Sequence, residues 1–169
     1  MIRLVIGYTW DGAVLPEADR ASVVLTLTES ELVIEVDAPY RGDPPPTGPV
    51  GPTDRLWEHE VIEVFVVGEG ERYTEIELSP HGHHWVLRLE GIRSPMTRGI
   101  PIAFEATIEG ERWRGIARIE RSHLPDEPVR CNVFRISGVG TARRFAAWVP
   151  VPGPAPDFHR LEQFGPWLL

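Results

Sequence analysis

The stretch that decides the fold runs from Glu60 to Leu89 and reads EVIEVFVVGEGERYTEIELSPHGHHWVLRL. It holds three short runs in which successive side chains alternate in direction and character, separated by residues that favour turns. A period of two is the repeat of a β-strand, whereas a helix repeats every 3.6 residues. This stretch therefore predicts three consecutive antiparallel strands, the second and third joined by the Ser79-Pro80-His81-Gly82 turn.

The same pattern extends outward along the chain, and helical periodicity is weak throughout. Only Arg121–Leu124 and Phe158–Phe164 could form a turn or two of helix. Two proline-rich loops are expected, at Tyr40–Asp54 and Pro150–Asp157, because proline supplies no backbone donor to a sheet. Expected strands are Arg3–Thr9, Ser22–Thr28, Leu32–Ala38, Glu60–Val67, Arg72–Ser79, His83–Leu89, Ala103–Glu109, Arg112–Ile119, Val129–Ser137 and Arg143–Val149. About ten short strands predict an all-β antiparallel sandwich, with residues 1–169 as a single domain.

Composition excludes several classes of function. The chain has 169 residues, a formal net charge of -8 and a pI of about 5.2, so nucleic acid and anionic membranes are unfavourable partners. Every basic residue except histidine is arginine, which excludes Schiff-base lysines and Walker-type phosphate loops. The lone Cys131 cannot form an internal disulfide. A lysine-free composition is typical of a GC-rich genome, and the start of the chain has no signal-peptide pattern. We therefore expect a bacterial, cytoplasmic protein.

Strand register suggests where chemistry could reside. If Ile62, Val64 and Val66 face the core, Glu63 lies on the other face among Val61, Phe65 and Val67. A carboxylate in such surroundings needs a partner, such as Arg88 or a ligand hydroxyl. In the third strand, Trp85, Leu87 and Leu89 are expected to face inward, and Trp113 is likewise expected in the core. One sheet face would then present Glu63, Tyr73, Glu75, Glu77, His84 and Arg88. A merely solvated face would also show these charges.

Three segments resemble the family 9 carbohydrate-binding modules and the wider DOMON-like superfamily. The first is LWEHEVIEVF, from Leu56 to Phe65, which carries a loop tryptophan before an acidic strand, with Glu60 where aspartate is usual. The second is the hairpin YTEIELSPHG, from Tyr73 to Gly82. The third is the end of the chain, where DFHRLEQFG from Asp157 to Gly165 is similar to an F-H-x-P-E-x-F-G motif, with Leu161 in place of the proline.

The resemblance implies a jelly-roll-like β-sandwich that holds one or two sugar units between aromatic rings and polar side chains. Trp57 would be the first stacking ring and Glu63 the carboxylate that binds hydroxyls. A second ring is expected from Trp148, with Trp167 as the reserve. Arg88 and Asn132 are added as ligand-binding residues on strand position and polarity.

Other patterns offer alternatives. His81, His83 and His84 could hold a transition metal, but no carboxylate or cysteine joins them at recognisable spacing. Some DOMON relatives bind haem, yet Met1 and Met96 are the only methionines. Glu63 with Glu75 or Glu77 could form a glycosidase pair, and an interaction domain could keep the fold without binding sugar. The sequence favours a non-catalytic binder of a sugar or small glycan, with no cofactor, no metal and no catalytic residue, and without nucleic acid or membrane partners.

Overall fold

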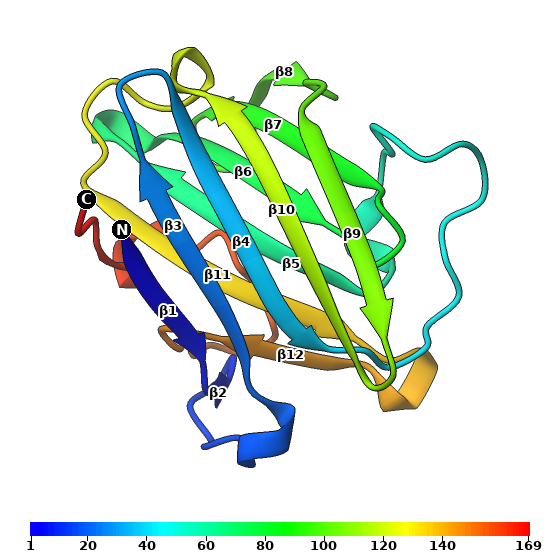
Figure 1. Ribbon diagram of the computed structural model, residues 1–169. Helices are drawn as coiled ribbons and strands as arrows, with labels where there is room; N and C mark the ends of the chain where they lie inside the picture. Colours follow the sequence, from blue (N-terminus) through cyan, green and yellow to red (C-terminus); the bar gives the residue numbers. More distant parts are fainter.

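The molecule consists of two antiparallel β-sheets packed face to face. A computed structural model describes all residues from 1 to 169. Figure 1 shows the smaller sheet in front of the larger one. The five-stranded sheet has the order β1-β3-β4-β10-β9, formed by Ile2–Ile6, Ala21–Leu27, Glu31–Pro39, Arg112–Glu120 and Ala103–Glu109. The all-β antiparallel sandwich predicted from the sequence is confirmed.

The eight-stranded sheet carries the candidate site. Its order is β2-β12-β11-β5-β6-β7-β8, and β13 pairs with β11. These strands are Tyr8–Thr9, Arg144–Ala147, Arg130–Ser137, Val61–Val67, Arg72–Leu78, His84–Glu90 and Pro95–Arg98, with β13 at Gly165–Pro166. Short 3-10 helices lie at Glu17–Asp19, Leu56–Glu58, Glu69–Glu71, Arg121–His123, Gly140–Ala142 and Leu161–Gln163. None of the helices is long and apolar enough to span a membrane.

Two apolar clusters stabilise the fold. The larger fills the space between the sheets and includes Ile62, Val64, Val66 and the fully buried Trp113, as the sequence predicts. The smaller lies on the outer face of the eight-stranded sheet, where the C-terminal segment covers Phe65 and Phe134. All seven residues of β5 are consequently buried. The apolar character of both faces of VIEVFVV matches this double covering, since a strand buried on both sides needs no polar face.

The segment from Phe158 to Phe164 covers part of the outer face of the larger sheet. Only Leu161–Gln163 forms a turn of 3-10 helix. Phe158, Leu161 and Phe164 pack onto the outer sheet face, and Phe158 stacks on Phe134 with ring centroids 3.9 Å apart. The segment covers a face of the sandwich, and this cover creates the walls of a pocket.

Candidate functional site

The register of β5 and β6 brings three glutamates together on the outer face of the larger sheet. Glu63 lies directly opposite Glu77, and Glu75 lies opposite Phe65. Residues opposite each other in an antiparallel pair project to the same face. The predicted grouping of Glu63, Tyr73, Glu75 and Glu77 on one face therefore agrees with the structure.

The third strand of this group was placed in the wrong register. Leu87 pairs with Glu75 and Trp85 pairs with Glu77, so these apolar residues share the outer face with the glutamates. Val86 instead belongs to the core between the sheets, and His84 contacts Phe104 edge-on. The error arose because β7 carries large apolar side chains on both faces, so alternation alone gave no direction.

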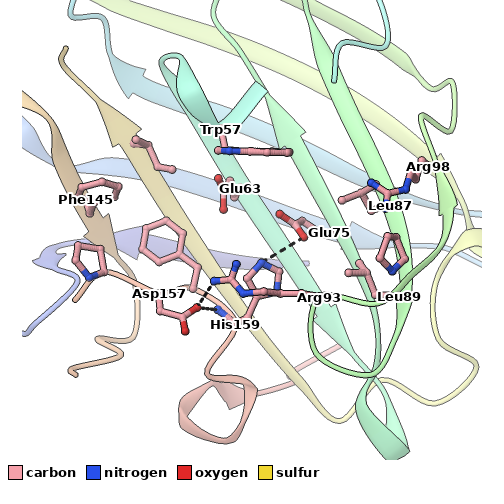
Figure 2. A pocket seen from close by; sticks show the side chains of 14 residues that line it. Trp57, Glu63, Glu75, Leu87, Leu89, Arg93, Arg98, Phe145, Asp157 and His159 are labelled. Atoms are coloured by element: carbon pink, nitrogen blue, oxygen red, sulfur yellow. Dashed lines mark hydrogen bonds and ion pairs between the residues drawn. The ribbon is translucent and has the colours of Figure 1, made fainter. Parts of the chain in front are cut away.

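A pocket of about 310 Å³ opens on this face. Figure 2 shows Trp57 at one side, the carboxyl groups of Glu63 and Glu75 at its floor, and Arg93 and Asp157 across from the indole. The pocket is lined by Trp57, Glu63, Glu75, Leu87, Leu89, Arg93, Pro95, Arg98, Ile136, Phe145, Pro156, Asp157, Phe158 and His159. Apolar walls with a few buried polar groups are the usual composition of a small-molecule site.

The indole of Trp57 is held at the pocket by a fixed loop. Trp57 is 39% exposed, whereas the preceding Leu56 is fully buried and anchors the turn. Arg55 has a positive φ of 62°, which turns the chain into the short helix. Arg143 donates hydrogen bonds to the carbonyl oxygens of Trp57 and Glu58. The ring is thus presented to solvent on an anchored backbone.

The floor of the pocket disfavours negative charge. Burial and the neighbouring Glu75 raise the pKa of Glu63 well above its ordinary value of 4.5. Burial raises the pKa of Glu75 to about 7. Burial, together with Glu63 and Glu75, also raises the pKa of Glu77 well above its ordinary value. A protonated carboxyl group can donate as well as accept a hydrogen bond, which suits it to a neutral hydroxyl-bearing ligand.

A chain of polar contacts leads from Glu75 to the pocket wall. The His159 Nε2 lies 3.9 Å from a carboxyl oxygen of Glu75, and His159 Nδ1 is 2.7 Å from the Tyr73 hydroxyl. Burial, assisted by the nearby charge of Arg93, lowers the pKa of His159 to about 4. The imidazole is therefore neutral at neutral pH, with one nitrogen able to donate and the other to accept.

The rim of the pocket contributes charge. Arg93 donates a hydrogen bond to Asp157 at 2.7 Å, and the same carboxylate oxygen accepts the backbone N–H of His159 at 2.9 Å. Burial raises and these hydrogen bonds lower the pKa of Asp157, which lies below its ordinary value overall. Arg98 lies opposite Leu87 on the neighbouring strand, which directs it to the same face. Ionic and neutral polar groups are thus separated between rim and floor.

Three residues proposed from the sequence do not line this pocket. Arg88 pairs with Thr74, which sends it to the opposite face, where it lines a separate open hollow. Asn132 is fully buried, and its amide group binds the backbone of Val149 and Val133. It joins β11 to the chain that follows β12 and is not among the residues that line the pocket.

Trp148, the residue expected to supply the second ring, does not line this pocket. It packs as a half-buried side chain against the core between the sheets, as does the reserve choice Trp167. A Cβ atom added at Gly165 would lie 2.7 Å from the Trp148 ring, which shows how closely the C-terminal strand covers it. The aromatic residues at the pocket besides Trp57 are Phe145, Phe158 and His159.

Several lining residues were missed, and only some carried a signal. Arg93 precedes and Arg98 ends a four-residue edge strand, Pro95–Arg98, which was not among the expected strands because it begins with proline and lacks alternation. His159 lies in Phe158–Phe164, for which the sequence predicted only a turn or two of helix. Its position depends on contact with Tyr73, 86 residues earlier, which no local pattern could reveal.

No group of three or more His, Cys, Asp or Glu side chains is arranged to hold a metal ion. The histidine cluster of the sequence is divided among different partners. His81 contacts Tyr40, His83 Nδ1 lies 2.8 Å from the Thr53 hydroxyl, and His84 Nε2 accepts from the Ile102 N–H at 3.4 Å.

Similar sequences come from vertebrates. The chain is 40% identical to the mouse UPF0462 protein C4orf33 homolog, over 96% of this chain and 88% of that protein. It is 37% identical to the zebrafish homolog, over 97% and 87%, and 35% identical to human UPF0462 protein C4orf33, over 94% and 84%. No family model matches the sequence. These vertebrate relatives contradict the expectation of a bacterial protein. The expectation was wrong because an arginine-rich, lysine-free composition reflects the base composition of a genome and does not identify the lineage.

Solved structures show the same fold at low sequence identity. A protein of Bacteroides uniformis, described as a candidate carbohydrate-binding protein, superposes with a TM-score of 0.72 and 16% identity, covering 98% of this chain and 85% of that chain. A family 9 carbohydrate-binding module from Caldicellulosiruptor kristjanssonii, solved with glucose, has a TM-score of 0.53 and 13% identity, covering 86% and 74%. The fold of this chain is therefore similar to that of family 9 carbohydrate-binding modules, as the sequence resemblance implied.

Proposed function

The chain belongs to the UPF0462 C4orf33 family, and from this premise we propose that it is a non-catalytic carbohydrate-binding protein whose site is the pocket beside Trp57. The observation that carries the proposal is a partly exposed indole, held on an anchored loop, over buried carboxyl groups that line the same pocket. The carbohydrate-binding description of its structural neighbours supports it.

The pocket offers a sugar ring two complementary surfaces. The C–H face of a pyranose is apolar and packs on a flat indole such as Trp57. Its hydroxyls can then reach Glu63 and Glu75, which lie at the floor (Figure 2). Phe145 and Phe158 close the apolar wall. A volume of about 310 Å³ lies at the lower end of small-ligand sites, roughly 300–1,000 Å³, which favours one or two sugar units.

Calorimetric titration with a panel of mono- and disaccharides tests this proposal. We expect saturable binding of one sugar class, and we expect Trp57→Ala to abolish it, because the indole provides the stacking surface. The denaturation midpoint of Trp57→Ala should stay close to that of the wild type. Ile116→Ala, which removes a 49% exposed side chain from the other sheet, is the matched control and should bind sugar normally.

Two results would contradict the proposal. Absence of heat for every sugar at millimolar concentration would leave the fold without the function and favour a protein-interaction domain. Unfolding of Trp57→Ala would show that the indole is structural, and the site would then have to lie elsewhere.

A further inference from the structure

Two buried glutamates of the same segment differ in their partners: Glu60 is hydrogen-bonded and ion-paired, and Glu63 is not. Glu60 is 3% exposed, and its carboxylate accepts the Arg41 N–H at 2.9 and 3.1 Å and pairs with Arg135 at 3.8 Å. Glu63 is equally buried, yet it makes no hydrogen bond or ion pair within the protein and faces the pocket. A buried acid without a partner is costly to keep.

The surroundings of Glu63 deepen this deficit. Glu77 lies directly opposite, and both of its carboxyl oxygens are buried without a hydrogen-bond partner. Glu75 accepts no hydrogen bond within the protein; the imidazole of His159 lies 3.9 Å from it, and Arg93 acts on it through space. Three acids thus converge on one part of the sheet face, and the pocket reaches two of them.

The cations nearest to Glu63 are already engaged. Arg143 donates to the carbonyl oxygens of Trp57, Glu58 and Gly138. Arg93 is paired with Asp157. Both guanidinium groups lower the cost of charge on Glu63 only through space. Arg93 and Arg98 line the same pocket, but no cation of the protein is paired with Glu63 at its floor.

We propose that the ligand supplies this cation and is an amino sugar, whose protonated amine binds Glu63 while its ring packs on Trp57. The inference rests on the sugar-binding function proposed above and names the class of sugar. An ammonium group makes charge-assisted hydrogen bonds to carboxylates and is attracted to aromatic faces. The hydroxyls of the amino sugar remain free to reach Glu75. A neutral sugar would offer Glu63 hydrogen bonds from its hydroxyls but no countercharge.

The experiment compares three matched sugars by calorimetry at neutral pH: glucosamine, N-acetylglucosamine and glucose. We expect glucosamine to bind at least about tenfold more tightly than the other two, in line with a hydrogen bond to a charged group. Glu63→Gln keeps the shape of the side chain and should reduce this advantage to less than about twofold. Glu105→Gln, an exposed change on β9, is the control and should preserve it.

Proton release gives a second readout that does not require a variant. Binding an ammonium group should ionise Glu63 and release a proton, so the glucosamine enthalpy should depend on the ionisation enthalpy of the buffer, while the glucose enthalpy should not. Equal affinities for glucosamine and glucose would overturn the inference and leave the proposed function intact. Failure of all sugars would defeat both, and binding of 2-aminoethanol as tightly as glucosamine would show a site for amines alone.

Discussion

Glu75 links the chemistry of the pocket to the stability of the protein. Its carboxyl group lies on β6 under the C-terminal segment, and burial raises its pKa to about 7. In the unfolded chain the same group ionises near 4.5. The folded protein therefore holds a proton that the unfolded chain has already released over this pH range.

This difference predicts a pH-dependent stability. Between about pH 4.5 and 7 the folded state binds more protons, so the free energy of unfolding falls as pH rises, and it stays lower above the folded pKa. Glu75→Gln removes this fall in the free energy of unfolding, because glutamine does not ionise. Relative to the wild type, the variant should gain up to about 3 kcal/mol on going from pH 4 to pH 8, at roughly 1.4 kcal/mol per pKa unit.

Urea denaturation of both proteins at several pH values measures this gain. Glu105→Gln serves as the exposed control and should follow the wild type at every pH. A stability difference between Glu75→Gln and wild type that is constant from pH 4 to pH 8 would show that Glu75 titrates normally.

The strands and loops that position the site were predicted from the sequence with different success. Most of the ten predicted strands lie close to observed ones, and the proline-rich loops followed from composition. The predicted strand Arg3–Thr9 is divided into β1 and β2, and β12 is shorter than predicted. Face assignment succeeded on β5, where Glu63 marks the outer side, and failed on β7. The edge strand β8 was missed because Pro95 can occupy only an edge position, which local patterns read as a loop.

The loop from Gly138 to Arg143 is the element that holds Trp57 in place. Gly138 has a positive φ of 83°, and its N–H donates to Asp43 at 2.7 Å. A Cβ atom at this position would lie 2.2 Å from the carbonyl oxygen of Ala142. The turn that directs Arg143 toward the Trp57 carbonyl therefore depends on glycine, both for its φ and for space.

A pair of glycine substitutions tests this dependence. Gly110 also has a positive φ, 62°, but a Cβ atom there would meet nothing within 4 Å. Gly110→Ala should cost about 1–2 kcal/mol of stability from backbone strain alone. Gly138→Ala should cost about 1–3 kcal/mol more, because the loop must also move. Equal losses for the two variants in chemical denaturation would show that the close contact at Gly138 does not constrain this loop.

At the scale of the whole molecule, the pocket exists because a sheet face is only partly covered. The C-terminal segment covers Phe65 and Phe134, while the pocket between this segment and Trp57 stays open (Figure 2). Trp57 and Glu63 could be proposed from the sequence because both lie in one contiguous motif. His159, Arg93 and Phe145 could not, since they reach the pocket through pairings between distant segments.

The measurement that tests the central claim most directly is a nuclear magnetic resonance titration of the indole N–H signals with the best-bound sugar. The chain has six tryptophans, and Trp57→Phe assigns the signal of Trp57. We predict that the Trp57 signal shifts saturably with sugar, while that of Trp113, buried between the sheets, stays fixed. Saturable shifts that leave Trp57 unmoved would place the sugar elsewhere and contradict this account.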